Sequence, residues 1–177
     1  MAERQVIRAG VITVSDKAAA GRREDASGPL LVSFLRKMGI EVVMQSIVPD
    51  ESDEIKRALT DLTDTVGVDL ALTTGGTGLT PRDVTPEATQ DLIEREVPGL
   101  AELLRFDGYQ KTPRAVLSRG MAGIRRKTLI INLPGNPKAV REGMETLTSL
   151  LPHAVQMLRG EDTEHAPEAV SPEVGLA

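Results

Sequence analysis

The feature that most constrains the fold is a short apolar stretch that runs directly into a loop of glycine and threonine. Residues 69–73 include the consecutive Leu70, Ala71 and Leu72, a pattern typical of a short parallel strand buried on both faces. Glycine lets the backbone approach an anion closely, and threonine adds hydroxyl donors. An anion-binding loop is therefore predicted, with a purely structural turn as the alternative, at Thr73, Thr74, Gly75, Gly76, Thr77 and Gly78.

Strand and helix patterns alternate along the rest of the chain. The strands are predicted at residues 8–15, 40–48, 69–73 and 128–132, and the helices at residues 29–38, 52–66, 100–108 and 152–158, with two more that start at Thr85 and Pro137. Residues 17–27 are predicted as a loop, and residues 111–126 as a loop with an edge strand. This alternation predicts an α/β fold, a three-layer αβα sandwich with a mostly parallel central sheet.

Composition limits the domain organisation and the kinds of metal site. The chain has 177 residues, no cysteine and two histidines, which excludes a disulfide framework and structural zinc. Residues 160–177 hold five of the 26 acidic residues and no Lys or Arg, so the remainder carries 21 acidic and 21 basic residues. We expect one domain over residues 1–160 and an acidic, disordered tail over residues 161–177.

The same composition bears on partners and location. Residues 1–159 have no net charge, and the chain has one Tyr, two Phe and no Trp. It therefore lacks the basic surface and the stacking aromatic side chains that nucleic-acid binding needs. No apolar run approaches the roughly 20 residues that cross a bilayer. The sequence therefore predicts a cytoplasmic protein without nucleic-acid or membrane partners.

Polar side chains gather where the predicted strands end. Asp50 follows the second strand, and Asp83 follows the glycine loop. Parallel strands present their carboxyl ends at one sheet edge, so these groups should share one site. Walker, dinucleotide-binding and hydrolase motifs are absent. An anion loop, two carboxylates suited to Mg²⁺, and two arginines that could face phosphate, Arg82 and Arg119, together suggest phosphoryl or nucleotidyl transfer.

Simpler interpretations of these residues stay open at this point. Asp50 and Asp83 can each be a helix N-cap, although Thr85 is predicted to supply the cap beside Asp83. Asn136, just before Pro137, is predicted to cap the next helix whatever else it does.

Three motifs carry a resemblance to a known family. They are residues 73–78, residues 82–88 (Arg-Asp-Val-Thr-Pro-Glu-Ala) and residues 133–139 (Leu-Pro-Gly-Asn-Pro-Lys-Ala). They resemble the MogA/MoaB family of molybdenum cofactor biosynthesis, and the corresponding domain of gephyrin is similar. The resemblance runs from about Arg8 to Leu158 and leaves out the acidic tail.

The resemblance implies a homotrimer that binds molybdopterin and adenylates it with Mg-ATP, releasing pyrophosphate. It implies that Asp50 and Asp83 are catalytic and hold Mg²⁺, and that a molybdate-insertion enzyme is the pathway partner. Substrate binding is assigned to Ser15, Asp16, Thr73, Thr74, Gly75, Gly76, Thr77, Gly78, Arg82, Ser118, Pro134, Gly135 and Asn136.

Two alternative functions remain beside this one. The shared motifs do not separate an active adenylyltransferase from a MoaB-like protein that binds molybdopterin without catalysis. A nucleotide pyrophosphatase of related fold, as in competence-damage-type proteins, is the third hypothesis, and it would cleave a dinucleotide without pterin.

Overall fold

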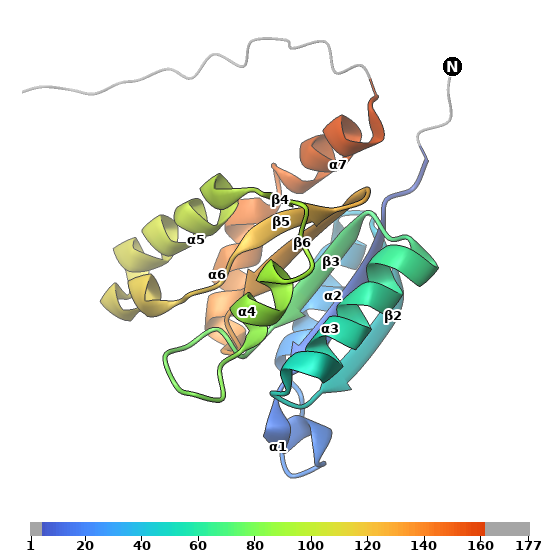
Figure 1. Ribbon diagram of the computed structural model, residues 1–177. Coiled ribbons are helices and arrows are strands. Elements are labelled where there is room, and N and C mark those ends of the chain that lie inside the picture. Colours follow the sequence, from blue (N-terminus) through green and yellow to red (C-terminus); the bar gives the residue numbers. More distant parts are fainter. Residues whose placement is uncertain (1–4, 162–177) are drawn as a thin grey trace, which may run out of the picture.

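The architecture is a six-stranded sheet between two layers of helices (Figure 1). The structure, a computed structural model, describes residues 5–161. In sheet order, the strands are β2 (Glu41–Val48), β1 (Arg8–Val14), β3 (Leu70–Thr74), β6 (Thr128–Leu133), β5 (Ala122–Arg125) and β4 (Arg95–Glu96). The first four are mutually parallel, and β5 and β4 are antiparallel to their neighbours. The predicted α/β fold with a mostly parallel sheet is confirmed.

The helices divide between the two faces of the sheet. One core contains residues of α2 (Ser27–Lys37), α5 (Pro98–Lys111), α6 (Pro137–Leu147) and α7 (Leu151–Arg159), and the other contains residues of α3 (Ser52–Thr60), η1 (Asp61–Val66) and α4 (Thr85–Gln90). Strand β3 contributes to both, because Leu70 and Leu72 lie in the first core and Ala71 in the second. Such burial on both faces explains why its sequence does not alternate between apolar and polar residues.

Strand register sets the place of the site. Thr74, the last residue of β3, pairs with Thr13 of β1 on one side and with Leu133 of β6 on the other. Val14 of β1 in turn pairs with Val48 of β2. The four parallel strands therefore end at nearly the same level, and the polar segments that follow them are delivered to one edge of the sheet.

Several local predictions were wrong in detail. Residues 17–27 are not a continuous loop, because they overlap the short helix α1 (Asp16–Ala19), whose N-cap Ser15 accepts a hydrogen bond from the Ala18 amide. The helix predicted at residues 52–66 has the predicted bounds and ends before Gly67, which is in the left-handed conformation, but its geometry changes from α to π at Asp61.

The region after α5 also differs from its prediction. Residues 113–117 form a 3₁₀ helix, η2 (Pro113–Leu117). The predicted edge strand in this region is β5, but it lies inside the sheet between β6 and β4. Its partner β4 has only two residues, and so short an element leaves no hydrophobic pattern in the sequence.

Two sequence-based expectations concern features beyond the core. Among residues 5–161, no helix is both long and apolar enough to cross a membrane. Apart from Glu161, the predicted acidic tail lies outside the described residues.

Candidate functional site

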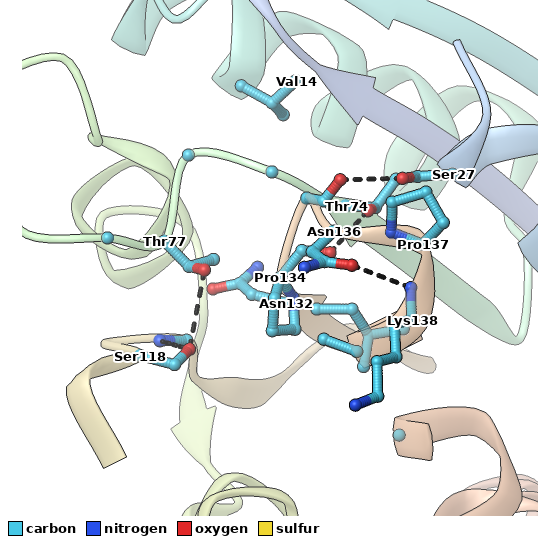
Figure 2. A pocket seen from close by; sticks show the side chains of 18 of the residues that line it. Val14, Ser27, Thr74, Thr77, Ser118, Asn132, Pro134, Asn136, Pro137 and Lys138 are labelled. Carbon is cyan, nitrogen blue, oxygen red and sulfur yellow. Dashed lines mark hydrogen bonds between the residues drawn. The ribbon is translucent and has the colours of Figure 1, made fainter. Parts of the chain in front are cut away.

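The polar segments at the sheet edge surround one pocket of about 930 Å³. Figure 2 shows this pocket from close by, with Thr74, Pro134 and Asn136 near one another and Thr77 facing Ser118. The predicted site residues that line it are Ser15, Asp50, Thr74, Gly75, Gly76, Thr77, Gly78, Asp83, Ser118, Pro134, Gly135 and Asn136. We call the part of the lining formed by residues 74–78, Asp83 and residues 134–136 the cradle wall.

Three residues predicted to bind substrate lie outside this lining. Asp16 and Arg82 form a bidentate pair, with Arg82 Nε 3.1 Å from Asp16 Oδ2 and Nη2 2.9 Å from Oδ1. Arg82 also pairs with Glu51 at 2.8 Å. Thr73 is fully buried, and its hydroxyl accepts a hydrogen bond from the amide of Asn132 at 3.0 Å. In the described structure these side chains support the pocket from outside, and their direct contact with substrate stays a prediction.

The glycine loop is held in a conformation that side chains would prevent. Gly75 has φ +108°, and a Cβ there would lie 2.2 Å from the Val14 carbonyl oxygen. Gly76 has φ +66°, and a Cβ there would lie 2.2 Å from Thr85 Oγ1. The Gly75 carbonyl accepts the Thr85 hydroxyl at 2.9 Å, and its amide donates to Leu133 O at 3.0 Å. The loop is therefore fixed between β1, β6 and the start of α4.

The Thr85 hydroxyl has a different role from the one predicted. Thr85 is the first residue of α4, and Val84 occupies the N-cap position without a side-chain cap. Because the Thr85 hydroxyl is used by Gly75, the prediction of Thr85 as the helix cap was wrong. Asn136, in contrast, caps α6 as predicted, with its side-chain oxygen 2.8 Å from the Lys138 amide.

Asp50 is joined to Asp16 by reciprocal hydrogen bonds. The Asp16 amide donates to Asp50 Oδ2 at 2.8 Å, and the Asp50 amide donates to Asp16 Oδ1 at 3.0 Å. Burial raises the pKa of Asp50 above its ordinary value, and repulsion from Asp16 and Asp83 adds to the rise, against the opposing effect of the Asp16 amide. The ionised form of Asp50 is therefore electrostatically unfavourable in the folded protein, and a bound cation would stabilise it.

Asp83 closes the turn that follows the glycine loop. Its Oδ2 accepts hydrogen bonds from the Thr80 amide at 2.9 Å and the Thr80 hydroxyl at 2.6 Å. Burial favours the neutral form, but the hydrogen bonds from Thr80 and Gly78 and the charge of Arg119 outweigh it, so the pKa of Asp83 lies below its ordinary value. Asp83 is therefore ionised at neutral pH.

The two aspartates suit a divalent cation that also binds phosphate. A Cβ on Gly76 would lie 3.2 Å from Asp50 Oδ1, and one on Gly78 would lie 2.9 Å from Asp83 Oδ2, so the loop leaves both carboxylates uncovered. Within residues 5–161, no three side chains of His, Cys, Asp or Glu are grouped to hold a metal by themselves. Mg²⁺ needs only one or two carboxylates when phosphate oxygens and water complete its shell, and these residues fit that requirement.

Arg119 does not face the pocket as an uncommitted cation. Its Nε donates to Gly78 O at 2.8 Å and its Nη2 to Asp83 O at 2.6 Å, while Nη1 pairs with the Glu87 carboxylate. Arg119 was predicted to be able to face phosphate, but in the structure its guanidinium is already bonded to the glycine loop, Asp83 and Glu87.

Another part of the pocket lining consists of residues from α5, η2 and α6, which we call the helical wall. Sequence reasoning missed it. Ser27 was missed as well; its hydroxyl donates to Gly135 O at 2.8 Å. The helical wall includes Ala101, Leu104, Arg105, Gly108, Lys111, Arg114, Ala115, Leu117, Lys138 and Gly143. The basic pair around Pro113 is the one local signal that could have indicated it.

Comparison with known proteins places this pocket in a family. The family model described as "Probable molybdopterin binding domain" matches residues 10–153. A Helicobacter pylori (strain ATCC 700392 / 26695) protein named molybdopterin adenylyltransferase is 42% identical over 158 residues, covering 88% of this chain and 90% of that protein. The molybdenum cofactor synthesis protein cinnamon of Drosophila melanogaster is 45% identical over 154 residues; the match covers 86% of this chain but only 26% of cinnamon.

Solved structures give the same result for the fold. The crystal structure of the molybdopterin biosynthesis enzyme MoaB from Thermus thermophilus superposes with a TM-score of 0.83 at 51% sequence identity, covering 88% of this chain and 98% of that one. The family match spans β1 to α7 and includes every segment that lines the pocket. The resemblance found in the three sequence motifs is confirmed, and the chain belongs to the MogA/MoaB family of molybdenum cofactor biosynthesis.

Proposed function

We propose that this protein is a molybdopterin adenylyltransferase, which transfers AMP from Mg-ATP to the phosphate of molybdopterin and releases pyrophosphate. The observation that carries the proposal is the convergence, in one pocket, of the glycine loop and the carboxylates of Asp50 and Asp83. The near full-length Helicobacter pylori relative that bears this name supports the choice of substrates.

The reaction is a substitution at the α-phosphorus of ATP. An oxygen of the molybdopterin phosphate forms the new bond to this phosphorus. The bond from the α-phosphorus to the oxygen that bridges to the β-phosphorus breaks, and its electron pair leaves with pyrophosphate. No covalent enzyme intermediate is needed, so the protein contributes mainly positioning and charge neutralisation.

The described residues divide these two tasks. Asp50 and Asp83 would hold Mg²⁺, which when bound neutralises the negative charge of the phosphates. The glycine loop would cradle a phosphate group with its backbone, at a place where Gly75 and Gly76 leave room for close approach. Arg23, Lys111, Arg114 and Lys138 add positive charge to the pocket lining and would attract both anionic substrates.

Product analysis separates this proposal from the two alternatives. The protein is incubated with molybdopterin and Mg-ATP, and the products are identified by mass spectrometry. An adenylated pterin with an equal amount of pyrophosphate is expected. Pterin binding without this product would instead support the MoaB-like binding protein, and cleavage of a dinucleotide such as NAD⁺ without pterin would support the pyrophosphatase.

We also propose the assembly and the cellular setting that the family resemblance implied. The subunits form a homotrimer, a proposal supported by exposed apolar side chains on α5 and η2, namely Phe106, Tyr109, Val116 and Leu117. Light scattering of the purified chain tests it, and a monomer would contradict it. A molybdate-insertion enzyme is the proposed next partner, and the cytoplasm, testable by cell fractionation, is the proposed location.

A further inference from the structure

Arg119 connects both ends of the segment that carries Asp83. Its backbone amide donates to Thr77 O at 2.9 Å. Its side chain then contacts Gly78 O at 2.8 Å, Asp83 O at 2.6 Å and the Glu87 carboxylate. One residue thus joins the last part of the glycine loop, the aspartate, and the first turn of α4.

The segment between these contacts is also held at Arg82, whose side chain pairs with Asp16 and Glu51. It projects beyond the sheet edge as the open loop between β3 and α4 (Figure 1). Leu79 is exposed, and the hydrogen bonds from Thr80 to Asp83 are internal to the turn. The Thr85 amide donates to Gly76 O at 3.1 Å and anchors the place where the chain enters α4. Arg82 thus holds one side of the turn, while Arg119 is bonded to the carbonyl groups at both of its ends, those of Gly78 and Asp83.

The partners of Arg119 also explain why it should act indirectly. Two of them are backbone carbonyl oxygens, which would repel a phosphate if they pointed toward it. Glu87 balances the charge of Arg119, and the hydrogen bond from Arg119 lowers the pKa of Glu87 below its ordinary value, so the pair stays ionised at neutral pH. A guanidinium with all its partners inside the protein is a poor ligand for substrate.

We propose that Arg119 is a positioning residue for the reaction: it turns the Gly78 and Asp83 carbonyls away from the anionic ligand and fixes the Asp83 carboxylate at the pocket. The importance of this position for turnover rests on the proposed adenylyl transfer. The positioning itself is a property of the protein without ligand and can be measured separately.

The test compares Arg119→Gln and Arg119→Lys with Arg125→Gln. Arg125 is a matched control, because it forms a bidentate pair with Asp64 at 2.9 and 2.6 Å and donates to Leu92 O at 3.0 Å. Like Arg119, it therefore joins one carboxylate to a backbone carbonyl. It belongs to β5 and is not among the residues that line the pocket.

The first measurement is hydrogen–deuterium exchange of the ligand-free proteins. Arg119→Gln should speed exchange at residues 77–84 by about 10-fold or more, the effect of losing charge-assisted hydrogen bonds. Exchange in β3 and β6 should not change, and Arg125→Gln should leave residues 77–84 as in the wild type. Equal exchange rates at residues 77–84 in the wild type and Arg119→Gln would overturn the proposal. An increase in the exchange rates of the sheet strands as large as that at residues 77–84 would overturn it as well.

The second measurement separates positioning from direct substrate binding. Arg119→Gln should lower kcat by about 10-fold or more with a smaller change in the KM for ATP, and Arg119→Lys should restore only part of it, because lysine lacks the planar fork that spans two carbonyls. A raised KM for ATP with unchanged kcat and unchanged loop exchange would make Arg119 a substrate ligand and overturn the proposal. If the wild type transfers no AMP, the proposed function fails, while the exchange comparison still decides the positioning.

Discussion

The cradle wall and the helical wall of the pocket differ in how far their polar groups are already bonded within the protein. On the cradle wall, Thr74 donates to Pro134 O at 2.7 Å, and Asp83 accepts two hydrogen bonds from Thr80. On the helical wall, Arg105 donates to Gly120 O at 2.8 Å, but the side chains of Lys111 and Arg114 make no hydrogen bond or ion pair within residues 5–161. Lys138 has only a long contact of 3.9 Å with Glu142.

This difference suggests a division of labour. Groups that are fixed before the ligand arrives need no reorganisation during the reaction, so the cradle wall suits the transition state. Cations on flexible side chains adapt to a ligand and attract its charge, so the helical wall suits substrate capture. Substitutions on the two walls should therefore change different kinetic parameters.

The largest expected effect follows from removing a carboxylate of the cradle wall. Asp83→Asn and Asp50→Asn should each lower kcat by about 100-fold or more, because the charge that would hold Mg²⁺ is lost. Each asparagine keeps an oxygen that can accept the existing amide hydrogen bond, so fold and pterin binding should persist. Steady-state kinetics with a circular dichroism control measures this. Unchanged turnover in either variant would remove that aspartate from the catalytic role.

The next effect concerns the stability of the cradle wall. Gly75→Ala should lower the free energy of unfolding by about 2–3 kcal/mol, since alanine at φ +108° is strained and its Cβ would collide with the Val14 carbonyl. Gly99→Ala, in the first turn of α5, has open space around the new Cβ and should be neutral or stabilising by up to about 1 kcal/mol. Urea unfolding compares them, and equal values would show that the loop conformation is not constrained as described.

The helical wall should give a smaller, salt-dependent effect. Lys111→Ala and Arg114→Ala should each raise the KM for ATP or molybdopterin about 2- to 5-fold with kcat nearly unchanged, the size expected for exposed charges. The effect should fade at high ionic strength. Lys127→Ala, at the turn before β6, serves as the control. A fall in kcat without a change in KM would contradict the division between the walls.

The smallest expected effect is a small rise in the free energy of unfolding for Asp50→Asn, a variant that also loses activity. Because the pKa of Asp50 is raised, the folded protein binds more protons than the unfolded chain between the two pKa values, so stability falls as pH rises through that window. At neutral pH the ionised Asp50 therefore destabilises the fold, and Asp50→Asn should add about 0.5–1 kcal/mol. Asp83→Asn should do the opposite, because its pKa is lowered. Thermal unfolding at pH 7 measures both, and destabilisation by Asp50→Asn would contradict the account.

The same comparison shows which parts of the molecule could be predicted from the sequence. Most of the cradle wall follows directly from local patterns, because each polar segment comes immediately after a buried strand whose apolar residues are easy to recognise. Residues 73–78 and Asn136 are examples. The parallel sheet then brings these segments together by topology alone.

The helical wall depends on packing between distant segments, which no local pattern reveals. Helix α5 buries only Ala101 fully and exposes Phe106 and Tyr109, so its apolar residues do not mark one face. The ion pairs that Arg82 and Arg119 form with carboxylates could not be predicted for the same reason, because their partners lie 31 to 66 residues away in the chain. The Thr85 hydroxyl was misassigned because a cap and a tertiary hydrogen bond require the same residue type.

Transfer of label from ATP tests the central claim most directly. The protein is incubated with molybdopterin, Mg²⁺ and ATP labelled at the α-phosphate, and the label in the pterin fraction is followed for the wild type, Asp50→Asn, Asp83→Asn and Lys127→Ala. We expect label in the pterin fraction with the wild type and Lys127→Ala, and about 100-fold slower transfer with both aspartate variants. Equal transfer by all four proteins, or no transfer by the wild type while pterin still binds, would contradict the account.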